Sequence, residues 1–289
     1  METPIRKYPI GTQDFETLIT GGFAYVDKTE FVYALTTNHR QVFLSRPRRF
    51  GKSLFLTTLK AYFEGKKELF NGLKISELEK DWTEYPVFHI EFNRSGFSSL
   101  ESLKSVLREN LAIIEKVWGE TDKNEELSVR FSTLIRKAAK KSGKKVVVLV
   151  DEYDKPLFST MHDDVLNDQM RTELKGFYGV LKAEDEHLRF VFLTGVTKFS
   201  QVSVFSDLNH LDDISLFKEY AQICGISEAE FFANFQPDIE KLATENEMNI
   251  EETVNKLRHY YDGYHFAKQS EGMYNPYSLL NTLQKHDFG

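Results

Sequence analysis

The clearest chemical pattern in the sequence is the loop at residues 45–53, which ends in Gly51, Lys52 and Ser53. Glycine, four residues and then Gly-Lys-Ser or Gly-Lys-Thr is the pattern of loops that wrap nucleotide phosphates. In such a loop the glycine permits a tight turn, the lysine neutralises phosphate oxygens and the hydroxyl ligates Mg²⁺. Residues 52–63 have a helical pattern, and the N-terminus of that helix would face the same anion. We therefore expect these three residues to bind nucleotide, and Ser53 to bind the metal as well.

The loop departs from that pattern at its first position, where Arg46 stands in place of the glycine. An arginine fits there if the loop enters by a different path. We assign the intervening Arg46, Arg48, Arg49 and Phe50 to the same nucleotide-binding loop. Because Gly-Lys-Ser also occurs at the N-terminus of an ordinary helix with an exposed lysine, a second element has to support the assignment.

The second element is the carboxylate pair that follows residues 146–150, five apolar β-formers in succession. A continuous apolar run is typical of a strand buried on both faces of a parallel sheet. It leads directly into Asp151 and Glu152, at the edge where ligands bind in open α/β sheets. Asp151 is suited to hold Mg²⁺ opposite Ser53, and Glu152 to orient or deprotonate an attacking water. The alternative is a polar turn that caps a strand.

A third group of polar residues follows the strand pattern at residues 188–194. Thr194 or Thr197 could contact the γ-phosphate and the lytic water, and Lys198 could contact phosphate charge. The alternative for each of them is a strand-end turn with an exposed lysine.

The elements that must position these groups alternate along the chain. Strand, helix, strand, helix is the order typical of an open α/β sheet. Strand patterns occupy residues 41–45, 86–92, 144–150 and 188–194, and helix patterns occupy residues 52–63, 98–117, 125–141 and 168–185.

Beyond about residue 212 the strand patterns fade and helical patterns dominate. We therefore predict an α/β core over residues 1–211 and a small helical lid over residues 212–289. The length of 289 residues also favours a core with a smaller appendage over one small domain.

The composition restricts the classes of protein that fit. With 41% apolar and 28% charged residues, the chain falls in the globular range. Its single cysteine, Cys224, excludes an internal disulfide and a cysteine metal cluster. The N-terminus lacks the apolar core of a signal peptide, and no apolar run approaches the ~18 residues of a membrane span. We expect a cytoplasmic protein without a membrane partner.

Charge bears on nucleic-acid binding. The 37 basic and 44 acidic residues give a net charge of −7, the opposite sign to that usual for non-specific nucleic-acid binding. The loop arginines and a basic cluster at residues 136–145 nevertheless leave direct nucleic-acid binding open. The alternative for the cluster is a solvated helix face.

Five motifs in this order resemble those of the bacterial AAA-ATPase-like family, whose members often carry a C-terminal PD-(D/E)XK nuclease-like domain. The arginine-rich loop without its first glycine is typical of that family. The motifs lie at residues 25–29, 46–53, 150–156, 194–200 and 261–264.

The resemblance implies a three-layer P-loop NTPase core with a mostly parallel sheet, a helical or winged-helix-like lid, and ATP with Mg²⁺ as cofactors. It places Lys28 at the start of a helix ahead of the first strand, beside the base or ribose. Residues 261–265 would lie in the lid and could reach back toward the nucleotide. The alternatives are an N-capped helix for the Lys28 segment and an aromatic-rich packing turn for residues 261–265. A nuclease-like partner domain would follow the lid, so a chain that ends at Gly289 is interpreted as a fragment or as a naturally short member.

Two functions are consistent with these residues. In the first, the protein is an ATP-hydrolysing switch in which Lys52, Glu152, Thr194 and Thr197 act at the reacting phosphate. In the second, it is a nucleotide-sensing interaction module with little hydrolysis that serves a nuclease or a nucleic-acid-associated system. Arg48 or Arg49 would act in trans only in a homo-oligomer; otherwise they fix the loop or bind phosphate within one chain.

Overall fold

A computed structural model describes residues 7–93, 96–197 and 211–288 of the chain. In these residues five strands form one parallel sheet in the order β2-β3-β4-β1-β5. Because the strands are parallel, the predicted loop after β1 and the predicted carboxylates after β3 lie at the same carboxyl edge of the sheet. They are not direct neighbours, because β4 lies between β1 and β3. The strands are β1 (Gln41–Ser45), β2 (Val87–Glu91), β3 (Val146–Asp151), β4 (Leu188–Gly195) and β5 (Asp212–Asp213).

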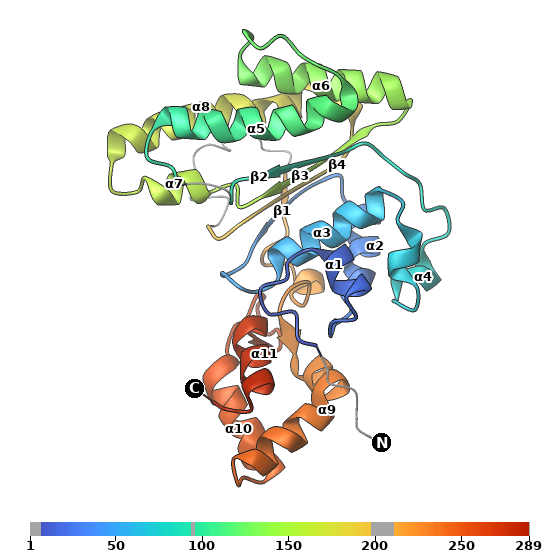
Figure 1. Ribbon diagram of the computed structural model, residues 1–289, viewed down its shortest axis with the longest axis vertical. Coiled ribbons are helices and arrows are strands. Elements are labelled where there is room, and N and C mark those ends of the chain that lie inside the picture. The colour runs from blue at the N-terminus through green and yellow to red at the C-terminus, as the bar shows by residue number, and fades with distance from the viewer. Residues whose placement is uncertain (1–6, 94–95, 198–210, 289) are drawn as a thin grey trace.

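Helices cover both faces of this sheet, which gives the predicted three-layer α/β core (Figure 1). One face carries α5, α6 and α8, and the other carries α1 to α4, as the labels in Figure 1 show. The first set is α5 (Leu100–Trp118), α6 (Leu127–Ser142) and α8 (Asp164–Ala183), and the second is α1 (Phe15–Thr20), α2 (Thr29–Asn38), α3 (Lys52–Phe63) and α4 (Ile75–Leu78).

Strand β3 is the centre of the two-sided core. Val146, Val148 and Val150 pack into the cluster under α5, α6 and α8. Val147 and Leu149 pack into the cluster on the opposite face. The continuous apolar run predicted this, because alternate side chains of a strand point to opposite faces.

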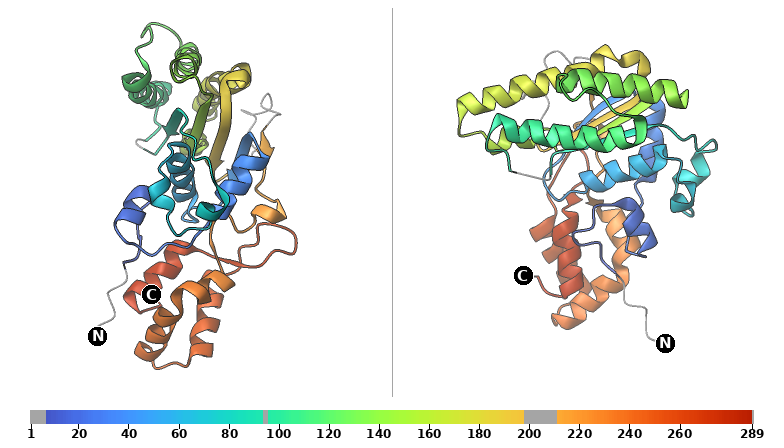
Figure 2. Two further views of the ribbon diagram at one scale, coloured as in Figure 1. Left: turned by 90° about the vertical axis from the view of Figure 1, so that its right-hand side faces the viewer. Right: turned by 45° about the horizontal axis from the view of Figure 1, so that its top comes forward.

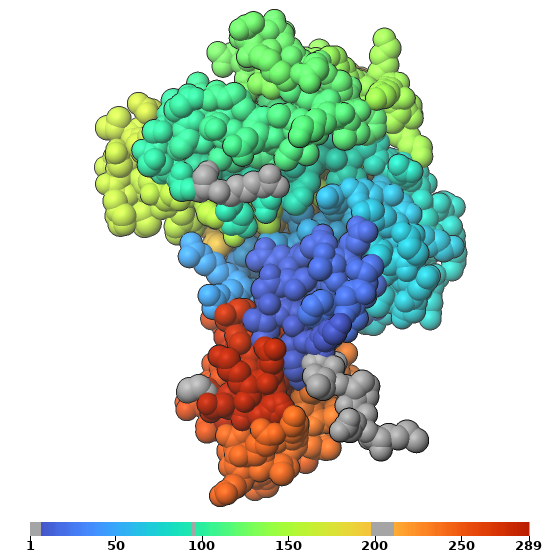
Figure 3. Space-filling model, viewed as in Figure 1, coloured from blue at the N-terminus to red at the C-terminus, as the bar shows by residue number. Residues whose placement is uncertain are grey.

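The C-terminal region forms a helical unit, called the lid below, with its own apolar core, which begins at Ile226 and includes Tyr8 from the N-terminal segment. A short antiparallel pair of strands joins the helices at their base. The lid occupies one end of the molecule in all views, against the N-terminal segment of the core (Figures 2 and 3). Its elements are β6 (Ile226–Ser227), α9 (Glu228–Glu245), α10 (Ile250–Tyr261), β7 (Met273–Tyr274) and α11 (Pro276–Lys285).

Residues 212–224 differ from the sequence-based division of the chain. We assigned them to the lid, but β5 pairs with β1, and Ile214, Ile223 and Cys224 pack into the core cluster. Two-residue strands carry no periodic pattern, so the sequence offered no signal for β5. Within the described ranges no helix is long and apolar enough to cross a membrane.

Candidate functional site

The loop between β1 and α3 turns tightly at Gly51, the N-cap of α3, which has a φ of 94°. A side chain at this angle would be strained, so glycine is needed here. The Lys52 ammonium donates hydrogen bonds to the carbonyl oxygens of Arg46, at 3.0 Å, and Pro47, at 3.1 Å. Burial lowers the pKa of Lys52, while nearby carboxylates act in the opposite direction. The loop therefore curls around the lysine that the sequence assigned to phosphate.

The end of β3 brings Asp151 to this loop. Asp151 is only 3% exposed, and its Oδ1 atom is buried without a hydrogen-bond partner. Burial raises the pKa of its carboxyl group to about 6, although the nearby Ser53 hydroxyl and the charge of Lys52 lower it. Ser53 and Asp151, predicted from separate parts of the sequence to share a metal ion, are therefore close enough for Ser53 to influence the Asp151 carboxyl group.

Glu152 is the next residue and has a left-handed backbone, with a φ of 53°. This conformation is uncommon for a residue other than glycine. Its carboxylate lies 3.3 Å from the Lys155 ammonium. Glu152 lines two separate cavities at the sheet edge, and Arg48 lines both of them as well.

The end of β4 lies beside these carboxylates, since Thr194 is the register partner of Asp151. Thr194 is fully buried, and its hydroxyl oxygen has no hydrogen-bond partner. Asp154 accepts hydrogen bonds from the backbone N–H groups of Val196, at 2.9 Å, and Thr197, at 2.6 Å. These contacts join the strand-end segments of β3 and β4.

Gly195 lets those two segments approach closely. A Cβ atom there would lie 2.4 Å from the Tyr153 ring and 2.6 Å from the Asp154 carboxylate. The Tyr153 hydroxyl donates to the carbonyl of Thr197 at 3.1 Å. Glycine is therefore required at position 195, because any Cβ atom would clash with the Tyr153 and Asp154 side chains. Lys198, which we expected to contact phosphate, lies outside the described residues.

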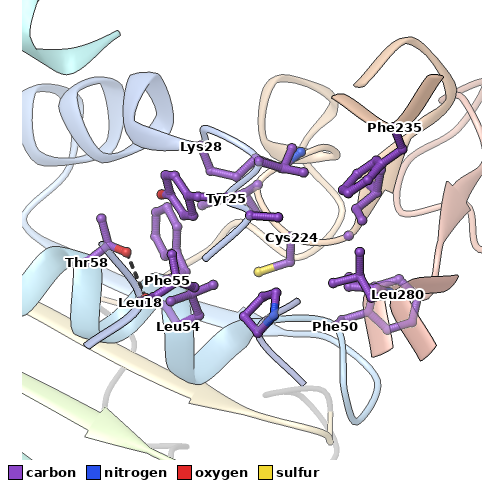
Figure 4. Close-up of a pocket in the computed structure, with 18 residues that line it drawn as sticks. Leu18, Tyr25, Lys28, Phe50, Leu54, Phe55, Thr58, Cys224, Phe235 and Leu280 are labelled. Atoms are coloured by element: carbon purple, nitrogen blue, oxygen red, sulfur yellow. Dashed lines mark hydrogen bonds between the residues drawn. The ribbon is translucent and has the colours of Figure 1, made fainter. Parts of the chain in front are cut away.

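Two adjoining cavities border the loop. One, of about 330 Å³, runs along the loop and Glu152. The other, of about 90 Å³, lies between core and lid and is mainly apolar; Figure 4 shows Cys224 in its middle, with Tyr25 and Lys28 to one side and Leu280 to the other. The two cavities share part of their lining, namely Pro9, Gly51, Leu54, Pro276 and Leu280.

Comparison with known proteins assigns the chain to a family. A family model described as a predicted AAA-ATPase, AAA-ATPase-like, matches residues 9–205. The chain belongs to the AAA-ATPase-like family. A protein of Azotobacter chroococcum mcd 1, named "Uncharacterized protein in vnfD 5'region", is 40% identical over 285 residues, which is 98% of this chain and 53% of that protein. The chain thus spans about half the length of this relative. No solved structure matched.

In this AAA-ATPase-like protein, Arg46 packs inside the fold. Its side chain is buried, and its guanidinium donates to the carbonyl oxygens of Ser45, Ser215 and Tyr220 at 2.8–2.9 Å. The guanidinium also lies 4.1 Å from the centre of the Phe266 ring. We expected Arg46 to bind nucleotide. The structure instead commits its side chain to backbone carbonyls, because a buried cation needs such partners.

Phe50 and Arg49 connect the loop to the C-terminal region. Phe50 packs edge-on against Tyr264 and Phe266, with ring centres 4.7 and 5.3 Å apart. Arg49 lies 4.0 Å from the centre of the Tyr277 ring. The Phe50 side chain lines the apolar cavity rather than the cavity along the loop. Part of the 261–265 motif of this AAA-ATPase-like chain therefore contacts the phosphate loop.

Lys28 also connects core and lid. Its ammonium lies 2.6 Å from Glu230 of α9, in a pair whose side chains are 10% and 20% exposed. Burial lowers the pKa of Lys28, and Glu230 acts in the opposite direction. Lys28 lines the apolar cavity, so its predicted place beside the base or ribose stays a prediction. Sequence reasoning missed Glu230 because nothing local links two residues on separate domains.

Several residues of the basic cluster at 136–145, on and just after α6, form bonds within the chain. Arg136 pairs with Glu184, Lys141 donates to the carbonyl of Val117, and Lys144 donates to that of Glu84. These bonds satisfy helix and loop carbonyls, as basic residues near helix ends often do. The basic side chains of the cluster are nevertheless exposed, so direct nucleic-acid binding stays a prediction.

Metal binding at the site would depend on the substrate. Among the described residues no group of three or more His, Cys, Asp or Glu side chains could hold an ion by itself. Mg²⁺ is usually held by one or two protein oxygens together with substrate phosphates. The unpartnered Asp151 oxygen beside Ser53 fits that arrangement.

Proposed function

We propose that this AAA-ATPase-like protein binds ATP with Mg²⁺ and hydrolyses it, and that its lid responds to the bound nucleotide. The observation that carries the proposal is the cavity of about 330 Å³ lined by Lys52 and Ser53, together with the buried, unpartnered oxygen of Asp151 nearby. These are the three groups that would neutralise a triphosphate and its metal ion. Phosphoryl transfer depends mainly on such positioning and charge.

The loop supplies the phosphate contacts. Lys52 is held by two loop carbonyls, at 3.0 and 3.1 Å, and would exchange them for phosphate oxygens. The N-terminus of α3, a helix of 12 residues, adds N–H donors and partial positive charge. An anion at this point would therefore be stabilised by both the side chain and the helix.

The residues around Asp151 fit a magnesium ion. Ser53 and the unpartnered carboxylate oxygen of Asp151 would hold it, with the phosphates completing the ligands. When bound, Mg²⁺ neutralises the charge that develops on the transferred phosphoryl group. The bound cation would also stabilise the ionised form of Asp151, which has no counter-charge among the apolar residues of β3.

Glu152 would orient and deprotonate the attacking water, since it lines the cavity that runs along the loop. Thr194 lies one strand away with a buried, unpartnered hydroxyl, which suits a contact to the γ-phosphate or the water. Thr197 is held by its backbone to Asp154 and keeps the same predicted role.

The base would lie toward the apolar cavity beside the loop, which at about 90 Å³ would have to widen at the junction of core and lid to admit it. This cavity shares five lining residues with the phosphate cavity, and a flat apolar base suits apolar walls. Lys28 and the Tyr25 hydroxyl are among the few polar groups on its walls. Because both core and lid contribute walls, the bound nucleotide would link the two.

Phosphate release tests this proposal. We expect Mg²⁺-dependent release from the wild type, loss of ATP binding in Lys52→Ala, and intact binding with turnover about 10²–10⁴-fold lower in Glu152→Gln. Lys60→Ala is the matched control, because Lys60 lies on the same helix and pairs only loosely with Glu64, at 3.9 Å. Equal rates from all four proteins would overturn the proposal.

A second function, nucleotide sensing with little hydrolysis, is favoured by the contacts of Phe50 and Arg46 with the C-terminal region. Through them a bound nucleotide could move the lid without being cleaved. Tight ATP binding by a wild type that releases no phosphate would distinguish this function from the first. If an arginine acts on a neighbouring copy, Arg48 is the candidate, since Arg49 stacks on Tyr277 within the chain.

A further inference from the structure

Lys155 bridges the ends of two neighbouring strands. It is the first residue of α7 (Lys155–Ser159), and its backbone N–H donates to the carbonyl of Glu152 at 3.0 Å. Its ammonium lies 2.5 Å from the Asn93 amide oxygen, just after β2, and 3.3 Å from the Glu152 carboxylate, just after β3. One side chain therefore links the candidate catalytic carboxylate to the adjoining strand.

Glu152 needs such a link because it borders two cavities. Besides the cavity along the loop, it lines a second one of about 260 Å³ together with Arg48, Asn93 and Lys155. The Glu152 and Lys155 side chains are 27% and 31% exposed, so solvent reaches both. A partly exposed glutamate without a partner samples several rotamers, and its freedom falls when a neighbour holds it.

We propose that Lys155 is a positioning residue for Glu152. Anchored by Asn93, its ammonium holds the carboxylate at the meeting point of the two cavities, where it accepts the proton of the attacking water. This inference rests on the proposed hydrolysis. In that reaction the water oxygen bonds to the γ-phosphorus, the bond to the β–γ bridging oxygen breaks, ADP leaves with those electrons, and the proton passes to Glu152. Lys155 itself gains and loses no proton.

Steady-state kinetics of three variants test the inference. We expect Lys155→Met to lower kcat about tenfold or more while KM for ATP stays within about twofold, because misplacement of a catalytic group affects the reaction more than binding. Lys155→Arg should restore most of kcat, and Asn93→Ala should give an intermediate loss. Lys241→Met is the matched control, since Lys241 forms a solvent-exposed pair with Glu245 on the lid.

A double variant separates positioning from a merely structural role. If Lys155 acts through Glu152, adding Lys155→Met to Glu152→Gln should cause no further loss of kcat. A further loss of the same size in the double variant would overturn the inference. So would a wild-type kcat in Lys155→Met, provided that Glu152→Gln is slow.

The controls also distinguish failure of the two proposals. Equal phosphate release from the wild type and Lys52→Ala would overturn the proposed hydrolysis, and the inference with it. Equal release from the wild type and Glu152→Gln, with loss in Lys52→Ala, would overturn the inference and leave hydrolysis standing. If Lys155→Met fails to fold, Asn93→Ala removes only the anchor, and an unchanged kcat in that variant would overturn the inference alone.

Discussion

The two halves of the candidate site are positioned by different kinds of contact. At the ends of β3 and β4, the backbone register sets Asp151 beside Thr194, and Asp154 accepts two backbone N–H bonds from the segment after β4. The loop between β1 and α3, in contrast, is tied by the side chains of Arg46 and Phe50 to the segment that leads into and through the lid.

This difference separates a rigid part of the site from a responsive one. We expect groups fixed by a buried sheet to keep their places in any movement of the lid, because the strand ladder would stay intact. A loop fixed by side chains across a junction changes when those side chains repack. We therefore expect changes at the sheet edge to alter catalysis and metal binding, and changes at the junction to alter stability and lid coupling.

The largest stability effect should come from Phe50→Ala. Phe50 is 1% exposed and packs on Tyr264 and Phe266, so truncation leaves a cavity between loop and lid. The free energy of unfolding in urea should fall by about 4 kcal/mol. Phe217→Ala, at a residue that is 42% exposed, is the control and should change it far less. Equal losses in the two variants would mean that the junction is not packed as described.

The arrangement of the sheet edge followed from local sequence. A buried strand appears in the sequence as an apolar run, and the residue that follows this run lies at the carboxyl edge of the sheet. Strand β3 ends at Asp151, one residue beyond the predicted strand at 144–150, and Ser53 is among the residues that lower the pKa of its carboxyl group. How close the ends of β1 and β3 lie depends on the order of the strands, which the sequence does not give. In the structure a single strand, β4, separates them.

The junction could not be predicted in the same way. Lys28 and Glu230 are 202 residues apart, and no periodicity connects them. Arg46 has the composition of a phosphate ligand, but its partners are carbonyl oxygens, which no sequence motif reports. The two-residue β5 was missed for a related reason, because its place depends on β1 rather than on its own residues.

At the rigid edge, Asp151→Asn should stabilise the protein at neutral pH and remove its Mg²⁺ response. Burial raises the carboxyl pKa from 3.8 to about 6, so ionised Asp151 destabilises the folded state. This penalty grows as pH rises from about 4 to about 6 and is fully present above that range. The gain in unfolding free energy should therefore be about 3 kcal/mol at pH 8 and shrink toward zero near pH 4.

Chemical denaturation of both proteins at the two pH values measures that gain, and ATP binding with and without Mg²⁺ measures the loss. A gain that is independent of pH would show that charge burial is not its cause. Unchanged Mg²⁺ dependence of ATP binding in Asp151→Asn would remove Asp151 from the metal site.

At the junction, Glu230→Gln should cost about 2 kcal/mol of unfolding free energy. The substitution keeps a group that can accept the capping bond from the Ser227 N–H, but it leaves the Lys28 ammonium buried without its counter-charge. Glu240→Gln, on the same helix, is the control. The loss of unfolding free energy in Glu230→Gln should be similar in 1 M salt and in dilute buffer, because the pair is largely shielded from solvent. Equal stability of the two variants would contradict a junction held by this ion pair.

The smallest effect should come from Tyr277→Ala, which removes the ring on which Arg49 stacks. Their separation of 4.0 Å is that of a cation–π contact, and at an exposed arginine such a contact contributes about 0.5–1 kcal/mol. Tyr277→Phe keeps the ring and should retain most of this stability. Because Tyr277 and Arg49 also line the phosphate cavity, the same pair of variants tests coupling: Tyr277→Ala should weaken ATP binding more than Tyr277→Phe does. If both weaken it equally, the hydroxyl rather than the stacked arginine links α11 to the loop.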